Sequence, residues 1–256
     1  MAIVESIEPE NGRYRADILF LHGLWTTAEI WKPAALGLAH RGWGCHLIDL
    51  RAGGPADTLE TWCQRAQGVV EEFAERPILV GHDAGALVAL ALSEHALARA
   101  VVADAPLLSG APRFHPRLAL AIARWRKQSL PPPPEQAPML QVGSAAGQTR
   151  LLHALCDDTA RLVDSLRGRA IQPGRPVVPT LLMASPQDPV VPESLVAITA
   201  KGIEASYLPR EGGHYGMLEE PYDIWMSQVQ RWLVLHAGPD LLRLSGAEDL
   251  DPDALI

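Results

Sequence analysis

Short runs of apolar residues, rich in β-formers, alternate along this chain with longer runs whose apolar residues recur at helical spacing. Strands are expected at residues 16–23, 44–50, 77–81, 99–106, 178–185 and 204–210. Helices are expected at residues 28–42, 57–76, 84–96, 192–202 and 221–237. Strands that alternate with helices form parallel sheets covered on both faces. The sequence therefore predicts an α/β protein with a mostly parallel, doubly wound sheet.

One stretch, residues 107–175, interrupts the alternation. It contains the proline run LPPPPEQAP, which we interpret as a stiff connector, and a long helical pattern at 148–168, but no convincing strand. A helical insertion between two strands predicts a cap over one end of the sheet. The predicted organisation is a core of residues 1–106 and 176–238, a helical cap of residues 107–175, and an acidic C-terminal tail of residues 239–256.

Composition excludes several classes of partner. The 256 residues suit one domain, and a net charge of −8 without a long basic run argues against nucleic acid. The three cysteines lie far apart without metal-ligand spacing, and the N-terminus lacks the apolar core of a signal peptide. No apolar run approaches the roughly 20 residues of a membrane span. We expect a soluble, cytoplasmic protein that binds a small molecule, with no metal and no cofactor; the oligomeric state is not predicted.

The stretch PILVGHDAGALVALAL, residues 77–92, carries a carboxylate in its most apolar surroundings. It predicts a buried strand, a tight turn and a helix, with Asp83 at the tip of the turn. Gly81 and Gly85 permit a sharp turn and close contact between helix and strand. Such a turn would make the Asp83 side chain project from the tip, so we expect its carboxylate to have a functional role.

Two further polar groups follow expected strands. Asp188 lies in MASPQDPVVP, and His214 lies between glycines in REGGHYGMLEEP. Ligands of doubly wound sheets bind beyond the carboxyl ends of the strands, so we expect these side chains to meet Asp83. Asp104, at the end of VVADAP, is the alternative acid, but we favour Asp188.

Four motifs together resemble the α/β-hydrolase family over nearly the whole chain: FLHG for the oxyanion strand, GHDAG for the nucleophile elbow, PQDPVVP for the acid loop and GGHYGMLEEP for the histidine loop. Most members carry serine where this chain has Asp83. An aspartate there resembles the haloalkane dehalogenases and epoxide hydrolases. The resemblance implies that Asp83 attacks an alkyl carbon and that His214, oriented by Asp188, activates water to cleave the ester.

The resemblance also implies further site residues and marks departures from these families. The backbone N–H groups of Leu24 and Ala84 would form the anion hole. Dehalogenases usually have Trp at the position of Ala84, and many have Asn at the position of Leu24. Epoxide hydrolases use cap tyrosines, and none of the four tyrosines lies in the predicted cap. The substrate-binding candidates are Trp25, His82, Trp125 and Tyr215.

Three functions stay open at this point. The leading hypothesis is a cofactor-independent hydrolase that uses Asp83 as nucleophile on a small, largely apolar substrate. The second is an isomerase, epimerase, cyclase or lyase in which Asp83 is a general acid or base. The missing halide donors and cap tyrosines favour this alternative, because proton transfer needs neither. The third is a non-enzymatic small-molecule binding protein.

Overall fold

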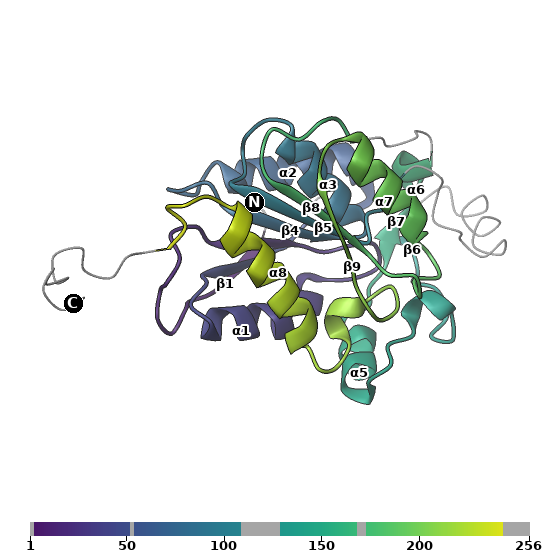
Figure 1. The fold of residues 1–256 in the computed structure, drawn as a ribbon. Coiled ribbons are helices and arrows are strands. Elements are labelled where there is room, and N and C mark those ends of the chain that lie inside the picture. Colours follow the sequence, from purple (N-terminus) through teal and green to yellow (C-terminus); the bar gives the residue numbers. More distant parts are fainter. Residues whose placement is uncertain (1–2, 52–53, 109–128, 168–172, 243–256) are drawn as a thin grey trace, which may run out of the picture.

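A seven-stranded sheet runs through the centre of the computed structural model, which describes residues 3–51, 54–108, 129–167 and 173–242 (Figure 1). The strand order is β1-β3-β2-β4-β5-β8-β9. Only β1 is antiparallel to its neighbour; the other pairs are parallel. The strands are β1 (Ile3–Ile7), β2 (Ile18–Leu21), β3 (Cys45–Asp49), β4 (Ile78–His82), β5 (Ala100–Asp104), β8 (Thr180–Ala184) and β9 (Ser206–Pro209). The predicted doubly wound α/β architecture is confirmed.

The central strands are apolar because helices cover both of their faces. Every residue of β2, β4, β5 and β8 is buried. Helices α2 (Leu59–Val70), α3 (Ala84–Ser93) and α7 (Glu193–Gly202) pack on one face, and α1 (Lys32–His40) and α8 (Asp223–His236) pack on the other (Figure 1). Helix α3 is buried along nearly its whole length, which explains its apolar sequence.

Strand β1 was not expected from the sequence. It is an edge strand that pairs with β3 alone, and its residues are mostly exposed or half-buried. Such a strand lacks the apolar run that marks the buried strands. The expected helix at 28–42 also begins differently, as the 3₁₀ helix η1 (Ala28–Trp31), before α1 continues it.

The insertion departs from the purely helical prediction. Its described part contains β6 (Ser129–Leu130) and β7 (Asp158–Thr159), which form a separate antiparallel pair, and the 3₁₀ helix η3 (Pro138–Leu140). The expected single helix is divided into α5 (Ala145–Ala154) and α6 (Ala160–Arg167). Residues 109–128 and 168–172 lie outside the described residues.

The break between α5 and α6 has a clear cause in backbone hydrogen bonding. The N–H of Cys156 donates to the carbonyl of Trp25, and the N–H of Thr27 donates to the carbonyl of Ala154. These bonds replace helical ones, so the segment at 155–159 lines up with the loop that follows β2. The insertion is thereby joined to residues 25–27, at the carboxyl end of β2.

The first testable prediction concerns the contact between α3 and β2 at Gly85. A β-carbon at this position would clash with the carbonyl oxygens of Leu21 and His22. Gly85→Ala should therefore cost about 3 kcal/mol of unfolding free energy and lower Tm by roughly 6 to 12 °C. Gly68→Ala, in open space on α2, is the matched control and should raise stability by about 0.5 to 1 kcal/mol. Equal thermal unfolding of the two variants would contradict this packing.

Candidate active site

Asp83 occupies a strained backbone conformation between β4 and α3. Its φ and ψ angles are 56° and −118°, outside the regions that non-glycine residues favour. Such strain persists where the surrounding structure over-determines the conformation, and it concentrates at functional sites. The expected sharp turn is therefore present, and it aims the carboxylate of Asp83 at the loops after β2 and β9.

Both oxygens of the Asp83 carboxylate are hydrogen-bonded. Oδ1 accepts from the backbone N–H of Leu24, at 3.2 Å, and from the backbone N–H of Ala84. Oδ2 lies 3.1 Å from Nε2 of His214. Ala84 begins α3, so the positive end of the helix dipole also faces this carboxylate. The two backbone groups expected from the sequence thus converge on one oxygen of Asp83 itself.

His214 lies between two carboxylates. Its Nδ1 is 2.8 Å from Oδ2 of Asp188, opposite the ring nitrogen that faces Asp83. The other oxygen of Asp188 accepts from the N–H groups of Val190, at 2.7 Å, and Val191, at 3.0 Å. The three side chains are at most 2% exposed. The structure therefore brings together Asp83, His214 and Asp188 in a buried site.

The two carboxylates fix the charge of this histidine. Burial opposes a charged imidazole, but Asp188 and Asp83 outweigh it and raise the pKa of His214 to about 9. Burial likewise opposes a charged Asp188, but His214 and two backbone N–H groups lower the pKa of Asp188 to about 2. With this pKa, His214 is an imidazolium at neutral pH, and each of its two ring N–H groups donates to one of the carboxylates.

Asp104, the alternative acid, makes a different contact. Its Oδ1 accepts from Nε of Arg210, and both side chains are almost fully buried. Arg210 also donates to the carbonyls of Gly213, at 2.7 Å, and His214, at 2.8 Å. Asp104 thus supports the backbone of the histidine loop through Arg210, while Asp188 contacts the ring. Arg210 was missed from the sequence, because no motif marks an arginine at the end of β9.

The three substrate-binding candidates that the structure describes are close to the site but deeply buried. Burial and the charge of His214 lower the pKa of His82 to about 4, so His82 is neutral and its Nε2–H donates to the carbonyl of His214 at 3.0 Å. The ring of Tyr215 packs against both histidines, with centroids 4.9 and 5.0 Å away. Trp25 is fully buried, and its indole N–H donates to the carbonyl of Leu130 in β6. Trp125 lies outside the described residues.

A further carboxyl group next to the site was missed from the sequence. Asp158, in β7, is 3% exposed, and its Oδ2 accepts from the backbone N–H of Trp25. The expected continuous helix at 148–168 concealed it. The sequence CDDTA does contain Thr159, a residue type that often precedes the first turn of a helix. In the structure, Thr159 accepts a hydrogen bond from the N–H of Leu162 at the start of α6.

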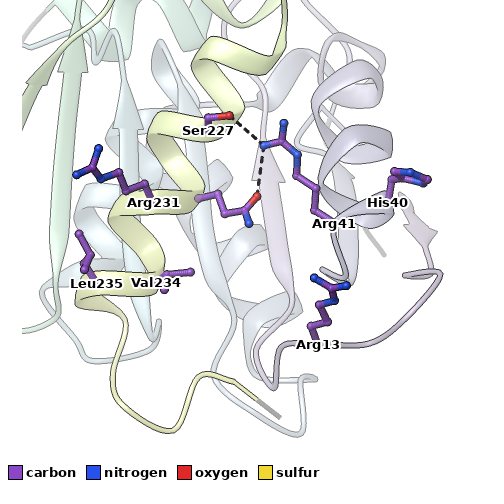
Figure 2. A pocket seen from close by; sticks show the side chains of 8 residues that line it. Arg13, His40, Arg41, Ser227, Arg231, Val234 and Leu235 are labelled. Atoms are coloured by element: carbon purple, nitrogen blue, oxygen red, sulfur yellow. Dashed lines mark hydrogen bonds between the residues drawn. The ribbon is translucent and has the colours of Figure 1, made fainter. Parts of the chain in front are cut away.

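A surface pocket of the described chain lies elsewhere and holds none of these side chains. It has a volume of about 640 Å³ and lies between α1 and α8, where Arg41 donates to Ser227 and Gln230 (Figure 2). Its lining residues are Arg13, His40, Arg41, Ser227, Gln230, Arg231, Val234 and Leu235. Asp83, His214 and Asp188 therefore lie outside this pocket.

Metal sites and membrane-spanning helices are considered for the described residues alone. There, no group of three or more His, Cys, Asp or Glu side chains is arranged to hold a metal ion. Among the described helices, none combines the length and apolar character that a bilayer span requires.

Comparison with known proteins identifies the family. The sequence profile of the Alpha/beta hydrolase family matches residues 18–225, so the chain belongs to this family of enzymes. The monoacylglycerol lipase of Paleococcus ferrophilus is 19% identical, with a TM-score of 0.75 over 92% of this chain and 99% of the other. The enol-lactonase of Burkholderia xenovorans is 15% identical, with a TM-score of 0.70 over 91% and 96%. No curated protein sequence matches the chain.

The yeast monoglyceride lipase, from Saccharomyces cerevisiae, gives a similar result: 13% identity and a TM-score of 0.76 over 91% of each chain. At such low identity, a structural likeness establishes the fold alone. The chain is thus an α/β-hydrolase with aspartate at its elbow, and the residues of its own site determine its reaction.

The second testable prediction concerns the charge of His214. In ¹⁵N NMR of histidine-labelled protein, both ring nitrogens of His214 should stay protonated at neutral pH and titrate near pH 9. Asp83→Asn should lower this pKa, because it removes one of the two charges that raise it. His214→Gln assigns the signal by its loss.

The same pKa sets a pH dependence of stability. The folded pKa of about 9 exceeds the ordinary value of 6.5, so the stabilisation is fully present below pH 6.5 and is lost as pH rises through 9. The difference in unfolding free energy between wild type and His214→Gln should shrink over that interval. A neutral His214 at pH 7, with no such change, would contradict the charged arrangement.

Proposed function

We propose that this enzyme hydrolyses a small, largely apolar molecule through a covalent ester between Asp83 and a saturated carbon of the substrate. One observation carries the proposal: a single oxygen of Asp83 accepts both backbone N–H groups of the anion hole, while the other oxygen faces His214. The buried apolar side chains around Asp83, among them Leu24, Leu107 and Leu108, support an apolar substrate.

The same observation argues against the carbonyl chemistry of a serine hydrolase. In that chemistry the anion hole receives the carbonyl oxygen of the substrate. Here the donors of Leu24 and Ala84 are engaged by the nucleophile, so an incoming carbonyl would find them occupied. A carboxylate that attacked a carbonyl would also form an anhydride. Attack on an alkyl carbon needs no hole for the substrate, and it leaves these donors where the next step requires them.

In the first step, Oδ2 of Asp83 displaces a leaving group from carbon and forms an alkyl ester. Oδ1 becomes the ester carbonyl oxygen and keeps its two hydrogen bonds. Esterification removes the negative charge of Asp83, which is one of the groups that raise the pKa of His214. The pKa of His214 therefore falls, and its proton can leave. Formation of the ester thus converts His214 from a cation into a base.

In the second step, His214 takes a proton from a water molecule, which attacks the ester carbonyl carbon. The negative charge that develops on Oδ1 is stabilised by the N–H groups of Leu24 and Ala84. Collapse of the intermediate releases the alcohol and restores the Asp83 carboxylate. Asp188 holds the imidazole in position throughout.

A second candidate is a non-hydrolytic isomerase, epimerase, cyclase or lyase, in which Asp83 and His214 transfer protons and no ester forms. The charged state of His214 favours it, because an imidazolium between two carboxylates is already a proton donor. The two candidates differ in whether Asp83 becomes covalently modified.

The third testable prediction uses this difference. His214→Gln should still form the ester, because an ionised carboxylate needs no base, but should fail to hydrolyse it. Incubation with 1-bromoalkanes of three to eight carbons should give protein heavier by one alkyl group, and incubation with 1,2-epoxyalkanes of that size should give protein heavier by one hydroxyalkyl group. Peptide mass spectrometry should locate either group at Asp83. The matched control Asp83→Asn should give no adduct at residue 83. Turnover by the wild type without any adduct in His214→Gln would favour the proton-transfer reaction instead.

A further inference from the structure

Asp158 has one carboxyl oxygen that the described residues leave unused. Its Oδ2 accepts from the N–H of Trp25, but its Oδ1 is buried and has no hydrogen-bond partner within the described chain. An unpaired buried polar atom costs about 1 to 3 kcal/mol, so a bound molecule that hydrogen-bonds to this oxygen would remove that cost.

The position of Asp158 places this carboxyl group beside the nucleophile. The N–H of Leu24 donates to Asp83, and the next N–H along the chain, that of Trp25, donates to Asp158. The two carboxyl groups are therefore held by the N–H groups of neighbouring residues in the loop after β2. The carboxylate of Asp83 is also close enough to raise the pKa of Asp158.

Asp158 is partly protonated at neutral pH, because its pKa is raised. Burial is the main cause that raises its pKa to about 7; the Trp25 N–H and Arg51 oppose the rise, and Asp83 and Asp57 add to it. Cys156 and Tyr215 also face Asp158, and the charge of Asp158 contributes to raising the pKa of each. Because Oδ2 accepts from a backbone N–H, the proton of the neutral form resides on Oδ1. This O–H group has no acceptor within the described chain.

We propose that Asp158 is the catalytic acid that protonates the leaving oxygen when Asp83 attacks, and that the substrate is consequently a strained cyclic ether, an epoxide. The inference rests on the proposed function of Asp83. A halide leaves without a proton and gains nothing from a neutral acid. The alkoxide of an opening ring does need a proton, and general acids of this kind contribute typically 10²- to 10⁴-fold to rate.

The proton balance closes over one turnover. A bond forms between Oδ2 of Asp83 and a ring carbon, the ring C–O bond breaks, and its oxygen takes the proton of Asp158. The Asp158 carboxylate then recovers a proton, through water, from His214. Neutral His214 activates the hydrolytic water and passes that proton to the departing alcohol, and protonated Asp83 returns a proton to His214. The sum is an epoxide plus water giving a diol.

Tyr215 is the alternative donor, because it is buried beside His214 and its pKa lies well above the ordinary value of 10. A phenol of that kind gives up a proton far less readily than the carboxyl group of Asp158. A purely structural role for Asp158, as an acceptor for Trp25, is the other alternative. Asp158→Asn separates these roles, since its amide oxygen can still accept from Trp25 while its side chain carries no acidic proton.

The fourth testable prediction compares two reagents in the His214→Gln background, which traps the ester. The rate of adduct formation at Asp83 is measured by mass spectrometry with a 1,2-epoxyalkane and with the 1-bromoalkane of equal length. Adding Asp158→Asn should lower the ratio of the epoxide rate to the bromide rate about 100-fold or more. The epoxide rate of the single variant should also fall as pH rises through about 7, and Asp158→Asn should abolish that fall. Asp157→Asn, at the exposed neighbouring position, is the matched control and should leave the ratio unchanged.

Each other outcome overturns the inference in a recognisable way. An unchanged ratio in Asp158→Asn, with bromide adducts still present, would reduce Asp158 to a structural acceptor. A ratio lowered by Tyr215→Phe and not by Asp158→Asn would assign the proton to Tyr215. If neither reagent modified Asp83, the proposed function itself would fail, and the role of Asp158 with it.

Discussion

Two backbone hydrogen bonds to one oxygen of Asp83 determine how the rest of the site can work. The N–H of Leu24 follows β2 and the N–H of Ala84 follows β4, and these strands are adjacent and parallel. Gly85 allows α3 to approach the carbonyls at the end of β2, which brings the two donors together. With one oxygen held in this way, the other must face His214. The two adjacent strands thus fix the orientation of the Asp83 carboxylate.

The charges around His214 depend on that orientation. Asp83 and Asp188 together keep the imidazole protonated despite its complete burial. In the proposed mechanism, an ester at Asp83 removes one of the two negative charges, so that His214 can act as a base on the hydrolytic water. The loop after β2 donates one N–H to Asp83 and the next to Asp158, so the proposed nucleophile and the proposed acid share one support. A change at Trp25 would therefore disturb both carboxyl groups.

The sequence predicts the helices and strands whose apolar residues recur at regular spacing. It does not predict the places where hydrogen bonds between distant parts of the chain replace regular structure. The central strands are readable because they are buried on both faces, and Asp83, Asp188 and His214 meet because parallel strands end at the same edge of the sheet. Strand β1 carries no such signal, since it pairs at an edge. The break between α5 and α6 escaped prediction because bonds to residues 25–27 replace helical ones. Asp158 lies in that break, and the salt bridge between Asp104 and Arg210 joins positions 106 residues apart.

The most direct test of a covalent Asp83 intermediate is a single turnover of a 1,2-epoxyalkane in H₂¹⁸O, with enzyme in excess. Water attacks the ester carbonyl carbon in this account, so the labelled oxygen must enter the carboxylate of Asp83. The first diol must carry an unlabelled oxygen that came from the protein. Mass spectrometry of the peptide containing Asp83 should show one ¹⁸O atom after one turnover. Label in the first diol, with none in Asp83, would contradict the covalent mechanism and assign Asp83 to proton transfer.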